Sequence, residues 1–122
     1  MIVNADNAVT TLTPEDVDAR RMKPGTLVVD IRDIRELERE GRIPGTKHIP
    51  RGMLEFWMHP DSPYFKDYFE DAEEVILHCN RGWRSALAAK ALLDIGIEVA
   101  HMDGGFTDWL QKDLPTESYV KG

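Results

Sequence analysis

Apolar and polar residues form a pattern along the chain that predicts strands alternating with helices. Two short apolar runs with little alternation, at 27–31 and 75–79, are typical of strands that helices cover on both faces. Weaker apolar runs at 48–50 and 98–102 predict two further strands. Strands that alternate with helices indicate an α/β domain with a mainly parallel sheet.

The stretches between these runs predict helices. One begins with Thr13 as its N-cap and Pro14 in its first position, and Asp33 starts another. The segment 85–95 is apolar around most of its circumference, so we expect it to pack tightly on the sheet. Shorter helices are expected at 53–58 and 106–111, with one or two helical turns at 64–69.

Length and charge narrow the class of protein. A chain of 122 residues fits one domain spanning 1–122. It contains no apolar run long enough to cross a membrane and no basic-then-apolar segment at the N-terminus, so we expect a cytoplasmic protein. With 15 basic and 22 acidic residues the net charge is −7, which argues against nucleic acid and anionic membranes as partners.

The chain has a single cysteine, Cys79. One cysteine forms no intramolecular disulfide and no multi-thiolate metal site, so it is either a small buried apolar residue or a reactive thiol. The histidines do not have the spacing of metal ligands either, and we expect no metal. These histidines are His48, His59, His78 and His101.

The residues after Cys79 favour the reactive thiol. Cys79 ends the predicted strand 75–79 and Ser85 starts a predicted helix, which places the loop between them at the carboxyl edge of the sheet. Backbone N–H groups of such a loop, the N-terminus of the following helix, and the charges of Arg81 and Arg84 all favour an anion there. We therefore expect a lowered pKa for Cys79, which leaves more of the reactive thiolate at neutral pH. The alternatives are an inert buried cysteine and arginines that are merely solvated.

Residues 79–85, Cys-Asn-Arg-Gly-Trp-Arg-Ser, resemble the active-site loop of the rhodanese family. Three further segments resemble landmarks of that family in the same order, and the resemblance covers about 10–115. It implies a three-layer α/β/α fold around a mainly parallel five-stranded sheet. The three segments are 28–32 (Val-Val-Asp-Ile-Arg), 41–50 (Gly-Arg-Ile-Pro-Gly-Thr-Lys-His-Ile-Pro), and 103–106 (Asp-Gly-Gly-Phe) with Trp109.

The resemblance also implies an activity, that of a thiosulfate sulfurtransferase without a cofactor. Cys79 would take sulfur from a small anionic donor, thiosulfate or a persulfide, and pass it to a thiol, cyanide or a protein cysteine. Arg84 would help to close the loop around the sulfur, and Asp30 and Arg32 would orient the loop, unless they form an ordinary surface ion pair. The expected substrate-binding residues are Asn80, Arg81, Gly82, Trp83 and Ser85.

Other functions stay open. The domain could pass sulfur or electrons to another protein, or be a non-catalytic interaction module, although such modules are expected to lose Cys79 or Arg84. The related phosphatases have a loop one residue longer than the four residues between Cys79 and Arg84 here, and this loop contains no acid for the leaving group.

Some positions depart from the family pattern. Arg42 stands where many members have histidine, and Arg81 and Trp83 replace smaller loop residues, which leaves the donor open. The aromatic residues of 51–70 are interpreted mainly as core between helix and sheet, with a place in the pocket wall as the alternative. They are Phe56, Trp57, Tyr64, Phe65, Tyr68 and Phe69.

Overall fold

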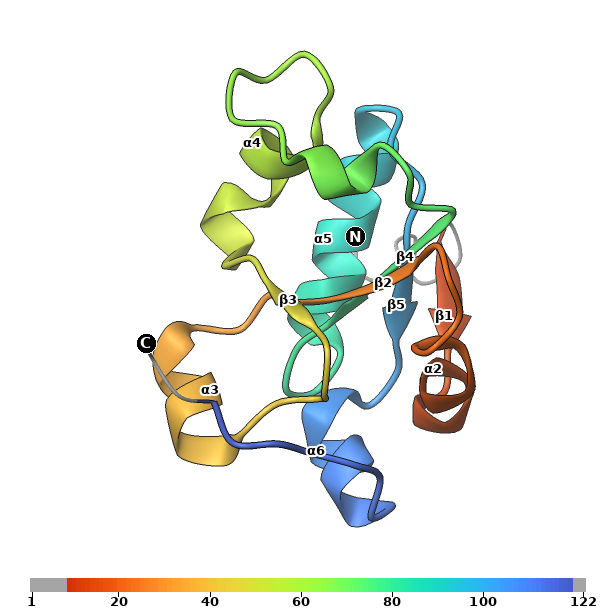
Figure 1. Cartoon of the computed structure of the whole chain (residues 1–122), viewed down its shortest axis with the longest axis vertical. Helices are drawn as coiled ribbons and strands as arrows, with labels where there is room; N and C mark the ends of the chain where they lie inside the picture. The colour runs from red at the N-terminus through yellow and green to blue at the C-terminus, as the bar shows by residue number, and fades with distance from the viewer. Residues whose placement is uncertain (1–8, 120–122) are drawn as a thin grey trace.

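The computed structural model describes residues 9–119, which form one five-stranded sheet with helices on both faces (Figure 1). Every pair of neighbouring strands is parallel, and the strand order is β1-β5-β4-β2-β3. The strands are β1 (Thr10–Leu12), β2 (Thr26–Asp30), β3 (Lys47–His48), β4 (Glu74–His78) and β5 (Ala100–Met102). The helices are α2 (Pro14–Arg20), α3 (Ile34–Glu40), α4 (Leu54–Met58), α5 (Trp83–Asp94) and α6 (Gly105–Gln111), with 3-10 turns at Arg51–Met53 and Asp67–Phe69.

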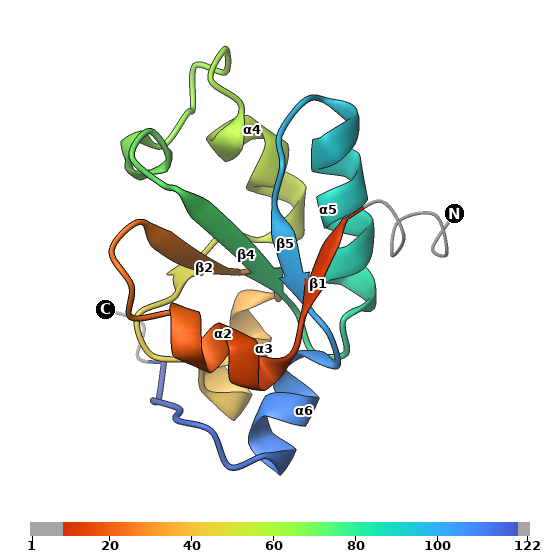
Figure 2. The same cartoon turned by 90° about the vertical axis from the view of Figure 1, so that its right-hand side faces the viewer.

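The helices divide the core into two layers, one on each face of the sheet (Figure 2). Helices α4 and α5 pack on one face, where β4 contributes Leu77 and the following residue Cys79. Helices α2 and α6 pack on the other face, against Ile76. The predicted α/β/α architecture with a parallel five-stranded sheet is therefore confirmed. Alternation along β4 decides which side chains of this strand face α5.

Helices α2 and α3 begin where the sequence predicts. The Thr13 side chain accepts a hydrogen bond from the Asp16 N–H at 3.1 Å, and the Asp16 side chain accepts one from the Thr13 N–H at 3.3 Å. Asp33 and Glu36 make the same reciprocal cap at the start of α3. Each cap satisfies backbone donors that the helix itself leaves without partners.

Two elements differ from the prediction. Strand β1 was not predicted, because only Leu12 of its three residues is buried and the segment has no apolar pattern. It forms because β5 offers it a parallel partner. Helix α5 begins at Trp83, two residues earlier than expected, because Gly82 takes the positive φ of 90° that ends the loop.

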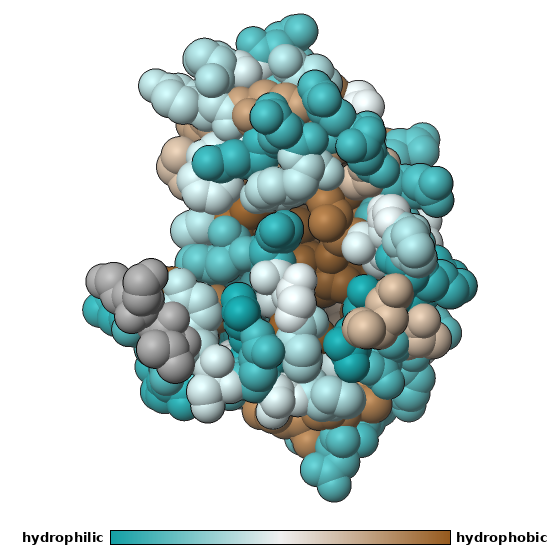
Figure 3. All heavy atoms as spheres, viewed as in Figure 1, coloured by the Kyte–Doolittle hydropathy of each residue, from teal (hydrophilic) through white to brown (hydrophobic). Residues whose placement is uncertain are grey.

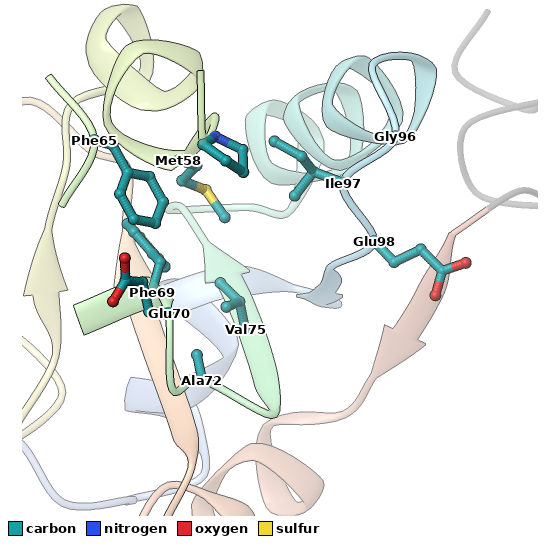
Figure 4. A pocket seen from close by; sticks show the side chains of 10 residues that line it. Met58, Phe65, Phe69, Glu70, Ala72, Val75, Gly96, Ile97 and Glu98 are labelled. Carbon is teal, nitrogen blue, oxygen red and sulfur yellow. The ribbon is translucent and has the colours of Figure 1, made fainter. Parts of the chain in front are cut away.

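The prediction that the aromatic residues of 51–70 are mainly core holds only in part, since two of the six pack against the core and none is fully buried. Phe56 and Tyr64 are 54% and 62% exposed, whereas Trp57 and Phe69 pack against the edge of the core. A pocket of about 510 Å³ opens beside Phe65 and Phe69 (Figure 4). Val75, near the start of β4, also lines this pocket. The pocket therefore lies at the opposite edge of the sheet from Cys79, which follows the end of β4.

The surface is mainly polar. In the view of Figure 3, polar side chains cover most of the visible face and surround an apolar hollow near its middle. Within residues 9–119, no helix combines the length and the apolarity that crossing a membrane requires.

Candidate active site

Cys79 directly follows β4 and lies under the first turn of α5, where it is 1% exposed. The chain turns from strand to helix within residues 80–82, and Gly82 makes this turn possible. Its φ of 90° disfavours other residues, and a Cβ there would lie 3.2 Å from the Gly104 nitrogen. This close turn brings the N-terminus of α5 over the sulfur atom.

Two backbone amides and one hydroxyl group converge on the Cys79 sulfur. The Gly82 N–H donates to Sγ at 3.2 Å and the Ser85 N–H donates to it at 3.4 Å. The Ser85 Oγ lies 3.6 Å from Sγ and accepts the thiol hydrogen. Donors aimed at one sulfur, at the positive end of a twelve-residue helix, favour its negatively charged form.

The start of α6 fixes the loop from the other side. The Phe106 N–H donates to the Cys79 carbonyl at 2.8 Å, and the Thr107 N–H donates to the Asn80 carbonyl at 2.9 Å. Gly105 allows this approach, because a Cβ there would lie 2.5 Å from the Cys79 carbonyl oxygen. The loop is thus held by the backbone of α6 as well as by its own helix.

A pocket of about 340 Å³ opens onto the sulfur. Trp83, with 65% of its surface exposed, and Arg81, also exposed, belong to its wall. None of the aromatic residues of 51–70 lines it. The lining residues are Cys79, Asn80, Arg81, Trp83 and Arg84.

Arg84 reaches from α5 across to α3, where Glu36 binds it through two hydrogen bonds of 2.8 and 3.0 Å. Glu36 also accepts a hydrogen bond of 2.7 Å from the Asn80 side chain. The hydrogen bonds from Arg84 hold the pKa of Glu36 below its ordinary value, against an opposing effect of burial. Glu36 therefore fixes both a loop residue and the arginine that follows the loop.

Sequence reasoning missed Glu36 as a site residue. Its spacing from Asp33 indicates a helix cap, and it does accept the Asp33 N–H at 2.8 Å. Nothing in that local pattern indicates a contact with residues 44 and 48 positions further along the chain.

Asp30 and Arg32 form a buried ion pair next to the loop, so the alternative of an ordinary surface pair is wrong. Both side chains are 0% exposed, and Nη2 of Arg32 lies 2.8 Å from Oδ2 of Asp30. Arg32 also donates to the Gly41 carbonyl at 2.8 Å and to the Asn80 side chain at 3.4 Å. Its guanidinium lies 4.2 Å from the centre of the Phe106 ring. This pair thus connects β2 to the loop and to α6.

His78 lies on the opposite face of β4 from Cys79, as strand alternation predicts. Burial holds the pKa of His78 below its ordinary value, so the ring is neutral at neutral pH. Burial alone would raise the pKa of Asp30, but its interactions with His78, 3.6 Å away, and with Arg32 lower it. The guanidinium of Arg32 is charged at every ordinary pH, so Arg32 balances the carboxylate charge at neutral pH.

The structure offers no cluster of metal ligands in the part of the chain that it describes. Between residues 9 and 119, no three or more histidine, cysteine or acidic side chains are grouped so that they could hold a metal ion.

Comparison with known proteins agrees with this geometry. The rhodanese-like domain family matches residues 13–112. The thiosulfate sulfurtransferase GlpE of Glaesserella parasuis is 27% identical over 113 residues, which cover 92% of this chain and 96% of that protein.

Two solved structures are similar as well. A Rhodopseudomonas palustris protein of unknown function, described as a possible tyrosine phosphatase, is 44% identical, with a TM-score of 0.89 over 95% of this chain and 90% of that one. The polysulfide-sulfur transferase of Wolinella succinogenes is 26% identical, with a TM-score of 0.70 over 98% of this chain and 85% of that one.

Proposed function

Because the chain belongs to the rhodanese-like domain family, we propose that it is a sulfurtransferase in which Cys79 carries the transferred sulfur as a persulfide. The observation that carries this proposal is the convergence of the Gly82 and Ser85 amides on the Cys79 sulfur. A sulfur atom so placed is suited to hold negative charge both before and after it accepts a second sulfur.

The reaction has two steps. The Cys79 thiolate attacks the outer sulfur of thiosulfate, a new S–S bond forms, and the S–S bond of thiosulfate breaks so that sulfite leaves with the electron pair. A thiolate or cyanide then attacks the outer sulfur of the persulfide, and the bonding electrons return to Cys79. Each step exchanges one bond to sulfur for another, so no cofactor and no external oxidant is required.

The residues around the sulfur have separate roles in this proposal. The amides of the loop stabilise the persulfide anion, and Arg84 adds positive charge from a position that Glu36 fixes. Arg81 and Trp83 lie in the pocket wall, where a donor or acceptor arrives. Asp30 and Arg32 support the loop through Asn80.

A phosphatase is the competing enzyme, since the similar Rhodopseudomonas palustris protein is described as a possible one. Four residues separate Cys79 and Arg84, and no residue of the loop is acidic. A phosphatase needs room for a tetrahedral phosphoryl group and an acid for the leaving group. These features support sulfur transfer over phosphate hydrolysis.

The test is the mass of the protein after incubation with thiosulfate and removal of excess reagent. The wild-type chain should gain one sulfur, about 32 Da, and lose it again on addition of cyanide. Cys79→Ser should gain nothing. Hydrolysis of p-nitrophenyl phosphate is measured on the same samples, and hydrolysis without any gain in mass would replace the proposal by a phosphatase.

A protein acceptor is a second candidate for the same chemistry. Trp83 is largely exposed beside the sulfur, which suits contact with a surface larger than cyanide. Trp83→Ala should then slow discharge of the persulfide to a protein thiol while leaving discharge to cyanide within about twofold. If Trp83→Ala changed both discharge rates by the same factor relative to the wild type, this would argue against a protein acceptor.

A further inference from the structure

A buried hydrogen-bonded chain leads from the cysteine to a histidine on the next strand. His101 lies on β5, is 2% exposed, and pairs with Leu77 of β4 in the sheet register. Its Nδ1 is 3.4 Å from the Ser85 Oγ, and its Nε2 is 3.1 Å from the Thr11 Oγ1. The Ser85 hydroxyl therefore links His101 to the Cys79 sulfur.

Counting hydrogens assigns the direction of these bonds. The Ser85 hydroxyl has one hydrogen, which it donates to the Gly82 carbonyl at 3.2 Å, while its oxygen accepts the Cys79 thiol hydrogen. The hydrogen between Ser85 and His101 must then come from Nδ1. A neutral imidazole has only one N–H, so Nε2 is an acceptor and Thr11 donates to it.

Loss of the thiol proton changes two hydrogen bonds in this arrangement. The sulfur turns from donor to acceptor, and the Ser85 hydroxyl hydrogen can rotate from the Gly82 carbonyl towards Sγ. His101 continues to donate to the same oxygen, so the hydroxyl hydrogen is not drawn towards the ring. The thiolate thereby gains a third donor in addition to the two amides.

We propose that His101, held in its Nδ1–H form by Thr11, is a positioning residue that keeps the Ser85 hydroxyl available to the Cys79 sulfur. In this arrangement His101 donates to Ser85 and takes no proton from the cysteine. Arg84 acts on the same sulfur through its charge. Glu36 binds Arg84, and Arg81 lies in the pocket wall. Asp30 and His78 lie on the opposite side of β2 and β4.

The proposal rests on Cys79 as the nucleophile of the proposed function, but its test needs no sulfur donor. The rate of alkylation of Cys79 by iodoacetamide is measured from pH 5.5 to 9.5. His101→Leu removes the N–H, whereas His101→Asn keeps an N–H at the place of Nδ1. Each variant is made in the wild-type chain and in a Ser85→Ala chain, and thermal unfolding confirms that every variant is folded.

Leu at position 101 should lower the alkylation rate on the acidic limb of the curve about fivefold to tenfold, the effect of one weakened hydrogen bond to a charged atom. Asn should restore the rate to within about twofold. In the Ser85→Ala chain, the Leu substitution should have no further effect, because the residue through which His101 acts is gone.

An equal effect of the Leu substitution in both chains, or failure of Asn to restore the rate, would overturn the proposal and leave His101 as a packing residue. If the Leu variant does not fold, Thr11→Val replaces it, since Val keeps the shape of an exposed strand residue but removes the hydroxyl. It should shift the curve in the same direction, and only when Ser85 is present. Loss of thiosulfate loading with an intact shift would count against the proposed function alone.

Discussion

Replacing Arg32 by Met should leave Asp30 as a buried carboxylate without its balancing charge. Arg32 and Asp30 are both 0% exposed, and three hydrogen bonds of 2.8 to 3.1 Å connect the guanidinium to the two carboxylate oxygens. Methionine replaces the apolar stem of the arginine, but it donates no hydrogen bond to Asp30 or to the Gly41 carbonyl.

The expected loss is large because the partner stays behind. Removing one member of a buried pair costs about 3–5 kcal/mol, whereas replacing both members costs much less. At about 4 °C per kcal/mol for a domain of this size, the melting temperature should fall by roughly 12–20 °C. Asp30→Asn in the Arg32→Met chain removes the unpaired charge and should recover about 2 kcal/mol.

The loss should also depend on pH. In the wild type the pKa of Asp30 is lowered on folding, so its contribution is complete above the unfolded value of about 3.9 and is lost as pH falls through the folded pKa. Without Arg32, burial raises this pKa, and the folded variant binds a proton at Asp30 or at the adjacent His78. The variant should therefore be less destabilised near pH 5 than at pH 7.5.

Urea unfolding followed by circular dichroism at both pH values measures these differences. Arg39→Met is the matched control, because Arg39 is 66% exposed and should lose at most about 0.5 kcal/mol. A loss below about 1 kcal/mol in Arg32→Met, or no recovery in the double variant, would refute the view that this pair is held by charge balance.

Three further substitutions test the charged residues around the sulfur. Arg84→Ala removes positive charge next to the sulfur and should slow alkylation of Cys79 at neutral pH about threefold. Glu36→Gln removes the anion that compensates this charge and should speed alkylation. An unchanged rate-versus-pH curve for Arg84→Ala would show that Arg84 is not part of the site. Arg81→Ala should slow loading from thiosulfate about tenfold and discharge to cyanide about twofold, and equal effects on both steps would contradict its role in binding the anionic donor.

Much of the fold could be predicted because its signals are local. The apolar run of 75–79 and the glycine that follows after two loop residues define β4, the turn and α5 within ten positions. The caps at Thr13 and Asp33 involve residues three positions apart. The same strand-loop-helix order indicates a thiol facing backbone amides, and the structure places two of them on Sγ.

The remainder depended on contacts between distant segments. The aromatic residues of 51–70 have the composition of a core, but the short helix α4 and the loop after it leave Phe56 and Tyr64 exposed and the other four half-buried. Strand β1 has no pattern of its own and exists through its pairing with β5. Such partners could not be predicted from the sequence, because the apolarity of a segment does not show which other segment will cover it.

The sequence by itself determined the order of strands and helices and the cysteine at one of their junctions, since side-chain periodicity and turn residues act over a few positions. Only the tertiary structure decided which side chains surround that cysteine. Glu36 meets Arg84 across 48 positions, and Thr11 meets His101 across 90. These contacts arise because the parallel sheet places strands and helices side by side that are far apart along the chain.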